Sequence, residues 1–90
     1  MKSYHIMVHG KVQKVGFRKF VHRMAKRYQL TGWVKNRTDG AVEMEVQGKE
    51  ENIALFLKKI KRGSLLARVE RIDVDERHSV DDFNSFLVKI

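Results

Sequence analysis

The chain has 90 residues, a net charge of +8, 33% charged residues and no cysteine. This length predicts one domain, residues 1–90, with a single core, and the lack of cysteine excludes disulfides, thiolate nucleophiles and cysteine metal sites. No segment approaches the roughly 18 apolar residues of a membrane span, and the N-terminus lacks the apolar run of a signal peptide. We therefore expect a cytoplasmic protein with no membrane partner.

The positive charge is concentrated in the first half of the chain. Residues 1–48 hold 10 Lys/Arg and 3 Asp/Glu, whereas residues 49–90 hold 9 and 8. A basic half is compatible with nucleic acid, an acidic membrane surface or a small anionic substrate, and charge alone does not choose among them.

Alternating hydrophobicity over Tyr4–Val8 predicts a strand with one buried face. The next segment, 17–28, has apolar residues at helical spacing and a cationic opposite face, which predicts an amphipathic helix. The apolar positions are Phe17, Phe20, Val21, Met24, Ala25 and Tyr28.

The rest of the chain adds four strands and one helix. A second helix, 50–62, begins with glutamates and ends with lysines and an arginine, as the helix dipole favours, and Gly63 follows as a C-terminal cap. Asp39-Gly40 predicts a tight hairpin turn. The strands are expected over 33–37, 42–47, 72–74 and 86–90. This β-α-β-β-α-β order with a closing strand predicts helices covering one face of an open sheet, a scaffold that hosts many functions.

The stretch GKVQKVGFR, residues 10–18, combines the features of an anion site. Gly10 ends a strand, Gly16 precedes a helix, and glycine allows positive φ and close approach of a ligand. A helix N-terminus offers unpaired N–H groups, and Arg18 adds a permanently charged fork. Because the lysine-serine/threonine ending of a P-loop is missing, ATP binding is disfavoured.

Two competing interpretations are weaker. Lys14–Val21 is similar to a basic-aromatic RNA-recognition motif, but its aromatics fall on a helix stripe rather than on an open strand. His5 and His9 are about 13 Å apart on one strand face, too far to share a metal ion. The acidic residues near the C-terminus are more typical of a solvated edge than of a cation site, and they are Asp73, Asp75, Glu76, Asp81 and Asp82.

Residues 10–18 and GWVKNRTDGAVEMEVQG, residues 32–48, resemble the two signatures of the acylphosphatases. The resemblance implies a ferredoxin-like α+β sandwich, βαββαβ, with a five-stranded, mostly antiparallel sheet and two helices on one face. It also implies metal-free hydrolysis of acyl phosphates. No cofactor is expected, and a monomer is the simplest expectation for the oligomeric state. By position, Arg18 binds the phosphate oxygens and Asn36 holds the attacking water. The backbone of the preceding loop cradles the phosphate, and its residues are Val12, Gln13, Lys14, Val15, Gly16 and Phe17.

The chemistry is consistent with this resemblance. The leaving carboxylate has a conjugate acid of pKa about 4 and needs no proton from the enzyme, and phosphoryl transfer mainly demands positioning and charge stabilisation. Inorganic phosphate or sulfate should compete for the cradle, and no specific nucleic acid is expected. Lys14 stands where the family signature has glycine, which leaves a non-catalytic anion- or RNA-binding module as the alternative function.

Overall fold

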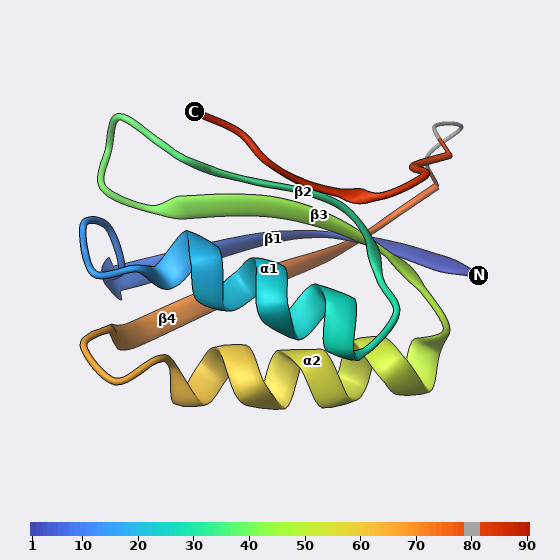
Figure 1. The fold of residues 1–90 in the computed structure, drawn as a ribbon, viewed down its shortest axis with the longest axis horizontal. Coiled ribbons are helices and arrows are strands. Elements are labelled where there is room, and N and C mark those ends of the chain that lie inside the picture. Colours follow the sequence, from blue (N-terminus) through green and yellow to red (C-terminus); the bar gives the residue numbers. More distant parts are fainter. Residues whose placement is uncertain (79–81) are drawn as a thin grey trace.

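The computed structural model describes residues 1–78 and 82–90, which form five strands and two helices. In chain order these are β1 (Lys2–Lys11), α1 (Phe17–Arg27), β2 (Thr31–Asn36), β3 (Val42–Gly48), α2 (Glu50–Arg62), β4 (Arg68–Arg77) and β5 (Phe86–Val88). The order is the one predicted from the sequence, and both helices lie on the same side of the sheet (Figure 1).

The five strands form one sheet in the order β4-β1-β3-β2-β5. β1 pairs antiparallel with both β3 and β4, and β2 pairs antiparallel with β3. Only the contact between β2 and β5 is parallel. The sheet is therefore mostly antiparallel, as the fold class requires, and β1, which lies between β4 and β3, leads directly into the predicted anion loop.

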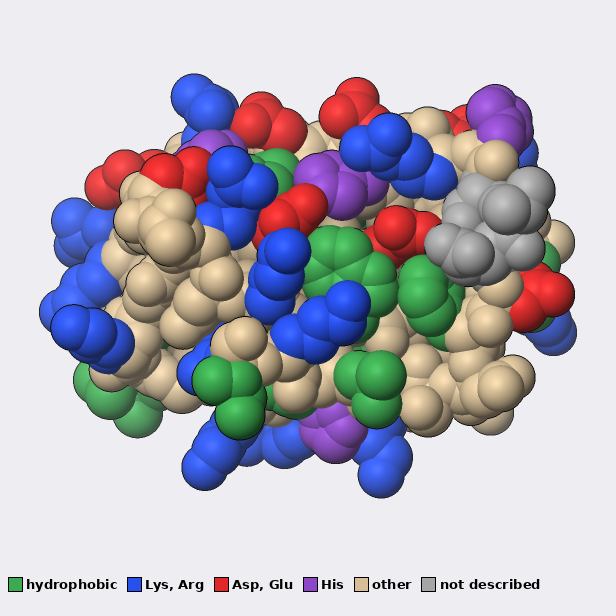
Figure 2. Space-filling model, turned by 90° about the horizontal axis from the view of Figure 1, so that it is seen from above, with side chains coloured by type: hydrophobic (Ala, Val, Ile, Leu, Met, Phe, Trp, Pro, Cys, Tyr) green, Lys and Arg blue, Asp and Glu red, His purple; other side chains and the backbone are tan. Residues whose placement is uncertain are grey.

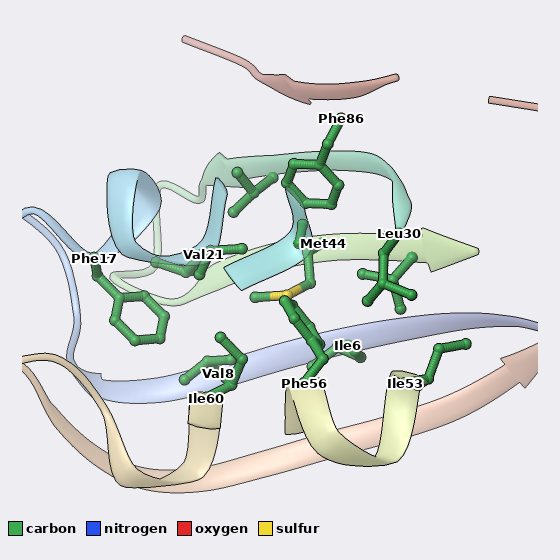
Figure 3. Packing of buried hydrophobic residues seen from close by; sticks show 14 of the residues in the cluster. Ile6, Val8, Phe17, Val21, Leu30, Met44, Ile53, Phe56, Ile60 and Phe86 are labelled. Atoms are coloured by element: carbon green, nitrogen blue, oxygen red, sulfur yellow. The ribbon is translucent and has the colours of Figure 1, made fainter. Parts of the chain in front are cut away.

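The core lies between the sheet and the two helices (Figure 3). Alternate residues of β1 and β3 point into it, and Ile6, Val8 and Met44 are fully buried. Each helix contributes one apolar stripe at a spacing of three to four residues, which is the spacing that aligns side chains on one helix face. The stripes are Phe17, Val21 and Ala25 in α1 and Ile53, Phe56 and Ile60 in α2.

Several predicted element boundaries were wrong, including that of the second strand, which spans Thr31–Asn36 rather than 33–37. The fourth strand spans Arg68–Arg77 rather than 72–74, because nearly its whole length pairs with β1. The fifth strand ends at Val88, where its pairing with β2 ends, and Ile90 is fully exposed. The β2–β3 connection spans residues 37–41, with Gly40 N–H donating to the Arg37 carbonyl at 3.3 Å, so it is longer than a two-residue turn.

Within the described ranges, no helix is long and apolar enough to cross a membrane. The prediction about Asp81 falls on residues 79–81, which lie outside the described part of the chain.

Candidate active site

The loop between β1 and α1 is shaped by residues in left-handed conformation. Gly16 has φ 76° and precedes the first helical residue, and Lys14 has φ 61°. At the start of the loop, a Cβ on Gly10 would lie 2.2 Å from the Arg68 carbonyl oxygen, so only glycine fits there. Val12 and Phe17 are buried and anchor the two ends of the loop in the core.

The loop presents a series of unpaired backbone N–H groups. Phe20 N–H donates to the Gly16 carbonyl at 3.1 Å, which is the first backbone hydrogen bond of the α1 turn. Among the described residues, no backbone carbonyl accepts from the N–H groups of residues 13–19. No side chain caps the helix either, and its first turn holds no acidic residue. These donors, together with the positive end of the helix dipole, favour an anion at this position.

Gln13 ties this loop to the connection between β2 and β3. Its Nε2 donates to the Arg37 carbonyl at 2.7 Å and to the Ala41 carbonyl at 2.9 Å. The same connection is closed by a bond from Arg37 N–H to the Ala41 carbonyl at 2.8 Å. One side chain therefore fixes the loop against the segment that follows Asn36.

Arg18 lies in the first turn of α1 and is held by the C-terminal segment. Its Nη1 donates to the Lys89 carbonyl at 2.7 Å, and Lys89 N–H in turn donates to the Val34 carbonyl at 2.8 Å. No ion pair with a described residue occupies the guanidinium. Since a guanidinium carries five N–H donors, most of them stay available to an anion.

Asn36 is the last residue of β2, opposite Val42 on β3. Its Oδ1 is buried, and no group of the described residues donates a hydrogen bond to it. Buried polar atoms in folded proteins are nearly always paired, so this oxygen is free to accept a hydrogen bond from a water or a ligand.

Asn36 and the loop line one hollow of about 180 Å³. Lys14, Gly16 and Arg18 contribute to it, as do Val12, Phe17 and Lys19. A second hollow of about 360 Å³ adjoins it and shares Asn36, with Lys35, Arg37, Thr38, Glu43 and Ile90 as its other lining residues. The structure thus brings Arg18, Asn36 and much of the predicted loop around one space, whereas the Gln13 side chain points to the hairpin instead.

Ion pairs stabilise the strand ends beside this space. Arg37 contacts Asp39 at 3.2 Å and Glu43 at 3.3 Å, and His5 contacts Glu43 at 2.6 Å. Partial burial works to raise the pKa of Glu43, but the hydrogen bonds from His5 and Arg37 outweigh it and hold that pKa below its usual range. The bond from Ala41 N–H, with Arg37 nearby, lowers the pKa of Asp39 despite some desolvation. Both carboxylates are therefore charged at neutral pH.

His9 and His22 do not line the hollow that contains Arg18 and Asn36. His9 contacts Asp73 at 3.0 Å, and His22 lies on α1 with its ring centroid 6.2 Å from that of Phe86. Over residues 1–78 and 82–90, no group of three His, Cys, Asp or Glu side chains is placed to hold a metal ion. Phe17 is buried and Phe20 partly buried against the core, which agrees with a core role for both aromatics.

Three features of the site escaped the sequence analysis. Lys19 lines the hollow, the Lys89 carbonyl holds Arg18, and the Gln13 side chain joins loop to hairpin. Lys19 follows Arg18 in the first turn of α1, so the sequence could have indicated that it lies near the anion site. The other two contacts join residues far apart in sequence, and no local pattern indicates them.

The chain is a small five-stranded α+β sandwich in which a loop with free backbone N–H groups among the described residues precedes the first helix. The acylphosphatase family model matches residues 4–88 of this chain. An acylphosphatase of Geobacillus kaustophilus is 49% identical over 88 residues, covering 98% of this chain and 94% of the relative. The crystal structure of acylphosphatase from Bacillus subtilis matches with a TM-score of 0.96 at 41% identity, covering all of both chains. An acylphosphatase structure from Coxiella burnetii matches at 0.92 and 36% identity, covering 98% of this chain and 92% of the other.

The chain therefore belongs to the acylphosphatase family. Its activity is that of the family, the hydrolysis of acyl phosphates, and its fold is the ferredoxin-like sandwich.

Proposed function

We propose that the hollow between the 12–18 loop and Asn36 is the catalytic site for acyl-phosphate hydrolysis. The substrate phosphate binds to the N–H groups of the loop and the α1 N-terminus, and Arg18 contacts its oxygens. The observation that carries this proposal is the buried Oδ1 of Asn36, which has no partner among the described residues and lines the same hollow as Arg18. A water bound there donates one hydrogen bond to Oδ1 and directs its oxygen lone pair at phosphorus.

The reaction is a single displacement. The water oxygen forms a bond to phosphorus while the bond from phosphorus to the acyl oxygen breaks, and the carboxylate leaves with that electron pair. The water's proton passes to the phosphate oxygens or to solvent. Because a carboxylate is a good leaving group, no general acid is required. The loop N–H groups and Arg18 stabilise the charge that spreads over the equatorial phosphate oxygens in the transition state.

The neutral amide of Asn36 suits this role. A carboxylate in its place would also accept from water, but it would repel the incoming phosphate. Attacking and leaving oxygens lie roughly in line, so the acyl group departs on the side away from Asn36. The adjoining hollow that shares Asn36 then provides a path by which water reaches the site.

The Lys89 carbonyl has a positioning role in this proposal. By accepting from Nη1 of Arg18 at 2.7 Å, it fixes the guanidinium before substrate binds. Gln13 has a similar role, because its two hydrogen bonds set the distance between the loop and the strand end that carries Asn36. Preorganisation of this kind lowers the barrier, since the groups need no rearrangement during the reaction.

The test is the hydrolysis of benzoyl phosphate in the presence of EDTA by wild type, Arg18→Ala and Asn36→Ala. Arg18→Ala should lose about 3–4 kcal/mol of transition-state stabilisation, a 10²–10³-fold fall in kcat/KM, and should bind inorganic phosphate more weakly. Asn36→Ala should lower kcat strongly while the inhibition constant for phosphate stays close to that of wild type.

Two outcomes would contradict the assignment. Wild-type kcat/KM in Arg18→Ala would remove Arg18 from the site. Equal losses of phosphate binding and kcat in Asn36→Ala would make Asn36 a structural residue of the hairpin. If wild type itself fails to hydrolyse benzoyl phosphate but still binds phosphate, the chain is a non-catalytic anion-binding module.

A further inference from the structure

Two leucines occupy the apex of the turn between α2 and β4. After α2 ends at Arg62, Ala67 N–H donates to the Ser64 carbonyl at 3.2 Å, which closes a four-residue turn. Leu65 and Leu66 are the two central residues of that turn, with 99% and 66% of their surface exposed. Glycine, asparagine and aspartate are the usual residues at such positions. We call Leu65 and Leu66 the leucine tip.

Basic side chains flank the leucine tip on both sides. Lys61 and Arg62 belong to the last turn of α2, and β4 begins at Arg68, which pairs with Lys11 at the end of β1. Within residues 1–78 and 82–90, none of these four cations forms an ion pair. The tip therefore combines exposed apolar surface with cations whose charge is not neutralised.

The helices extend this basic character. They carry nine of the 19 Lys/Arg and only two of the 11 Asp/Glu, which leaves ten basic and nine acidic residues in the rest of the chain. By contrast, the face seen in Figure 2 mixes acidic, basic and histidine side chains. Nearly all of the net charge thus lies on the helices, and one end of α2 adjoins the leucine tip.

We propose that the leucine tip and its four flanking cations form a docking site for an anionic membrane surface. The leucines enter the boundary between headgroups and acyl chains, and the cations lie at the level of the lipid phosphates. This arrangement fits an anionic lipid surface, because two exposed apolar side chains project from a turn whose flanking cations are not neutralised by ion pairs among the described residues. A second copy of the chain fits poorly, because a symmetric contact would place each cation cluster against itself.

Such docking would orient the catalytic loop. The connections 12–16, 37–41 and 63–67 lie at the same end of the molecule, on the left of Figure 1, and the pairing of Lys11 with Arg68 joins two of them. A membrane contact at the leucine tip therefore brings the phosphate loop near the lipid surface. The attachment is peripheral and involves no spanning segment, and it departs from the expectation from sequence that the chain has no membrane partner.

Co-sedimentation with vesicles tests the proposal directly. Full-length wild type is mixed with vesicles of phosphatidylcholine alone or of phosphatidylcholine with phosphatidylglycerol, at low and high salt. Wild type should bind only the anionic vesicles, and less at high salt. The double variant Leu65→Ser, Leu66→Ser should lose at least about tenfold in vesicle affinity. Each of Lys61→Gln and Arg62→Gln should lose about fivefold.

Matched controls come from elsewhere on the surface. Leu87→Ser removes another exposed leucine, from β5, and Lys49→Gln removes a cation at the opposite end of α2. Both should bind vesicles like wild type. Thermal melting and benzoyl phosphate hydrolysis should be unchanged in the leucine-tip variant, because neither leucine packs in the core or lines the catalytic hollow.

Three results would overturn the proposal. The first is equal binding to neutral and anionic vesicles, or binding to neither. The second is wild-type affinity of the leucine-tip variant while the glutamine variants lose binding, which would show plain adsorption of polyanions to a basic surface. The third is self-association of wild type in sedimentation equilibrium that the leucine-tip variant abolishes, which would show that a second copy covers the tip.

Discussion

Replacing Lys14 by glycine should relieve strain in the phosphate loop. Lys14 has φ 61°, and its exposed side chain forms no ion pair within the described residues. The left-handed conformation costs a residue with a Cβ about 1–2 kcal/mol. Glycine makes the unfolded chain more flexible, which offsets about 0.4–1 kcal/mol of that gain. The net effect is a stabilisation of about 0–1.5 kcal/mol.

Phosphate affinity should change little when Lys14 is replaced by glycine. Lys14 lines the catalytic hollow, but an exposed charge pair contributes only about 0–1 kcal/mol, so phosphate affinity should fall no more than about fivefold. The affinity should also become less dependent on salt, because one mobile cation is lost while the loop N–H groups and Arg18 remain.

The assay combines urea denaturation with phosphate inhibition constants at low and high salt. Gln29→Gly is the matched control, because Gln29 also has positive φ, 58°, but lies outside the catalytic hollow. It should gain similar stability, with phosphate inhibition unchanged. A Lys14→Gly variant that is clearly less stable than wild type would contradict the predicted relief of strain. It would mean that the lysine makes contacts worth more than its backbone strain.

Three further predictions concern the hairpin contact, acid stability and ligand binding. Gln13→Ala should lower kcat more than it weakens phosphate binding and should cost about 1–3 kcal/mol of stability, because two hydrogen bonds are lost while each carbonyl keeps only its backbone donor. Unchanged kcat would show that these bonds do not position Asn36. The hydrogen bond from His9 lowers the pKa of Asp73 more than desolvation raises it, Arg71 lowers it further, and the pKa of Glu43 is also lowered. Stability from such groups is present above their unfolded pKa and lost as pH falls, so the free energy of unfolding should decline below about pH 4. The decline should be less steep in Glu43→Gln. An identical slope in that variant would show that Glu43 does not contribute to the acid sensitivity. Phosphate or sulfate should raise Tm more than chloride at matched ionic strength, whereas equal effects would indicate charge screening alone.

Local sequence patterns were enough to predict the element order, which the structure confirms, and to predict an anion site in the loop. Local periodicity predicted both helices, because their apolar stripes, such as Phe17–Val21–Ala25, face one core and repeat at a fixed spacing. Gly16 and Arg18 indicated an anion site because positive φ, a helix N-terminus and a fixed cation are properties of neighbouring residues. The two signatures then led to the acylphosphatase family, to which the chain belongs.

Strand ends and the contacts that organise the site depended on the tertiary structure. β4 is longer than its hydrophobic pattern because pairing with β1 extends it, and β5 ends at Val88 because its pairing with β2 ends there. The bonds from Gln13 to the hairpin and from Arg18 to Lys89 join residues 24, 28 and 71 positions apart. Such contacts exist only once the sheet has brought these segments together, so no local pattern encodes them. The same holds for Asn36, whose buried oxygen has no partner among the described residues because of the strand that places it beside the loop, not because of its neighbours in sequence.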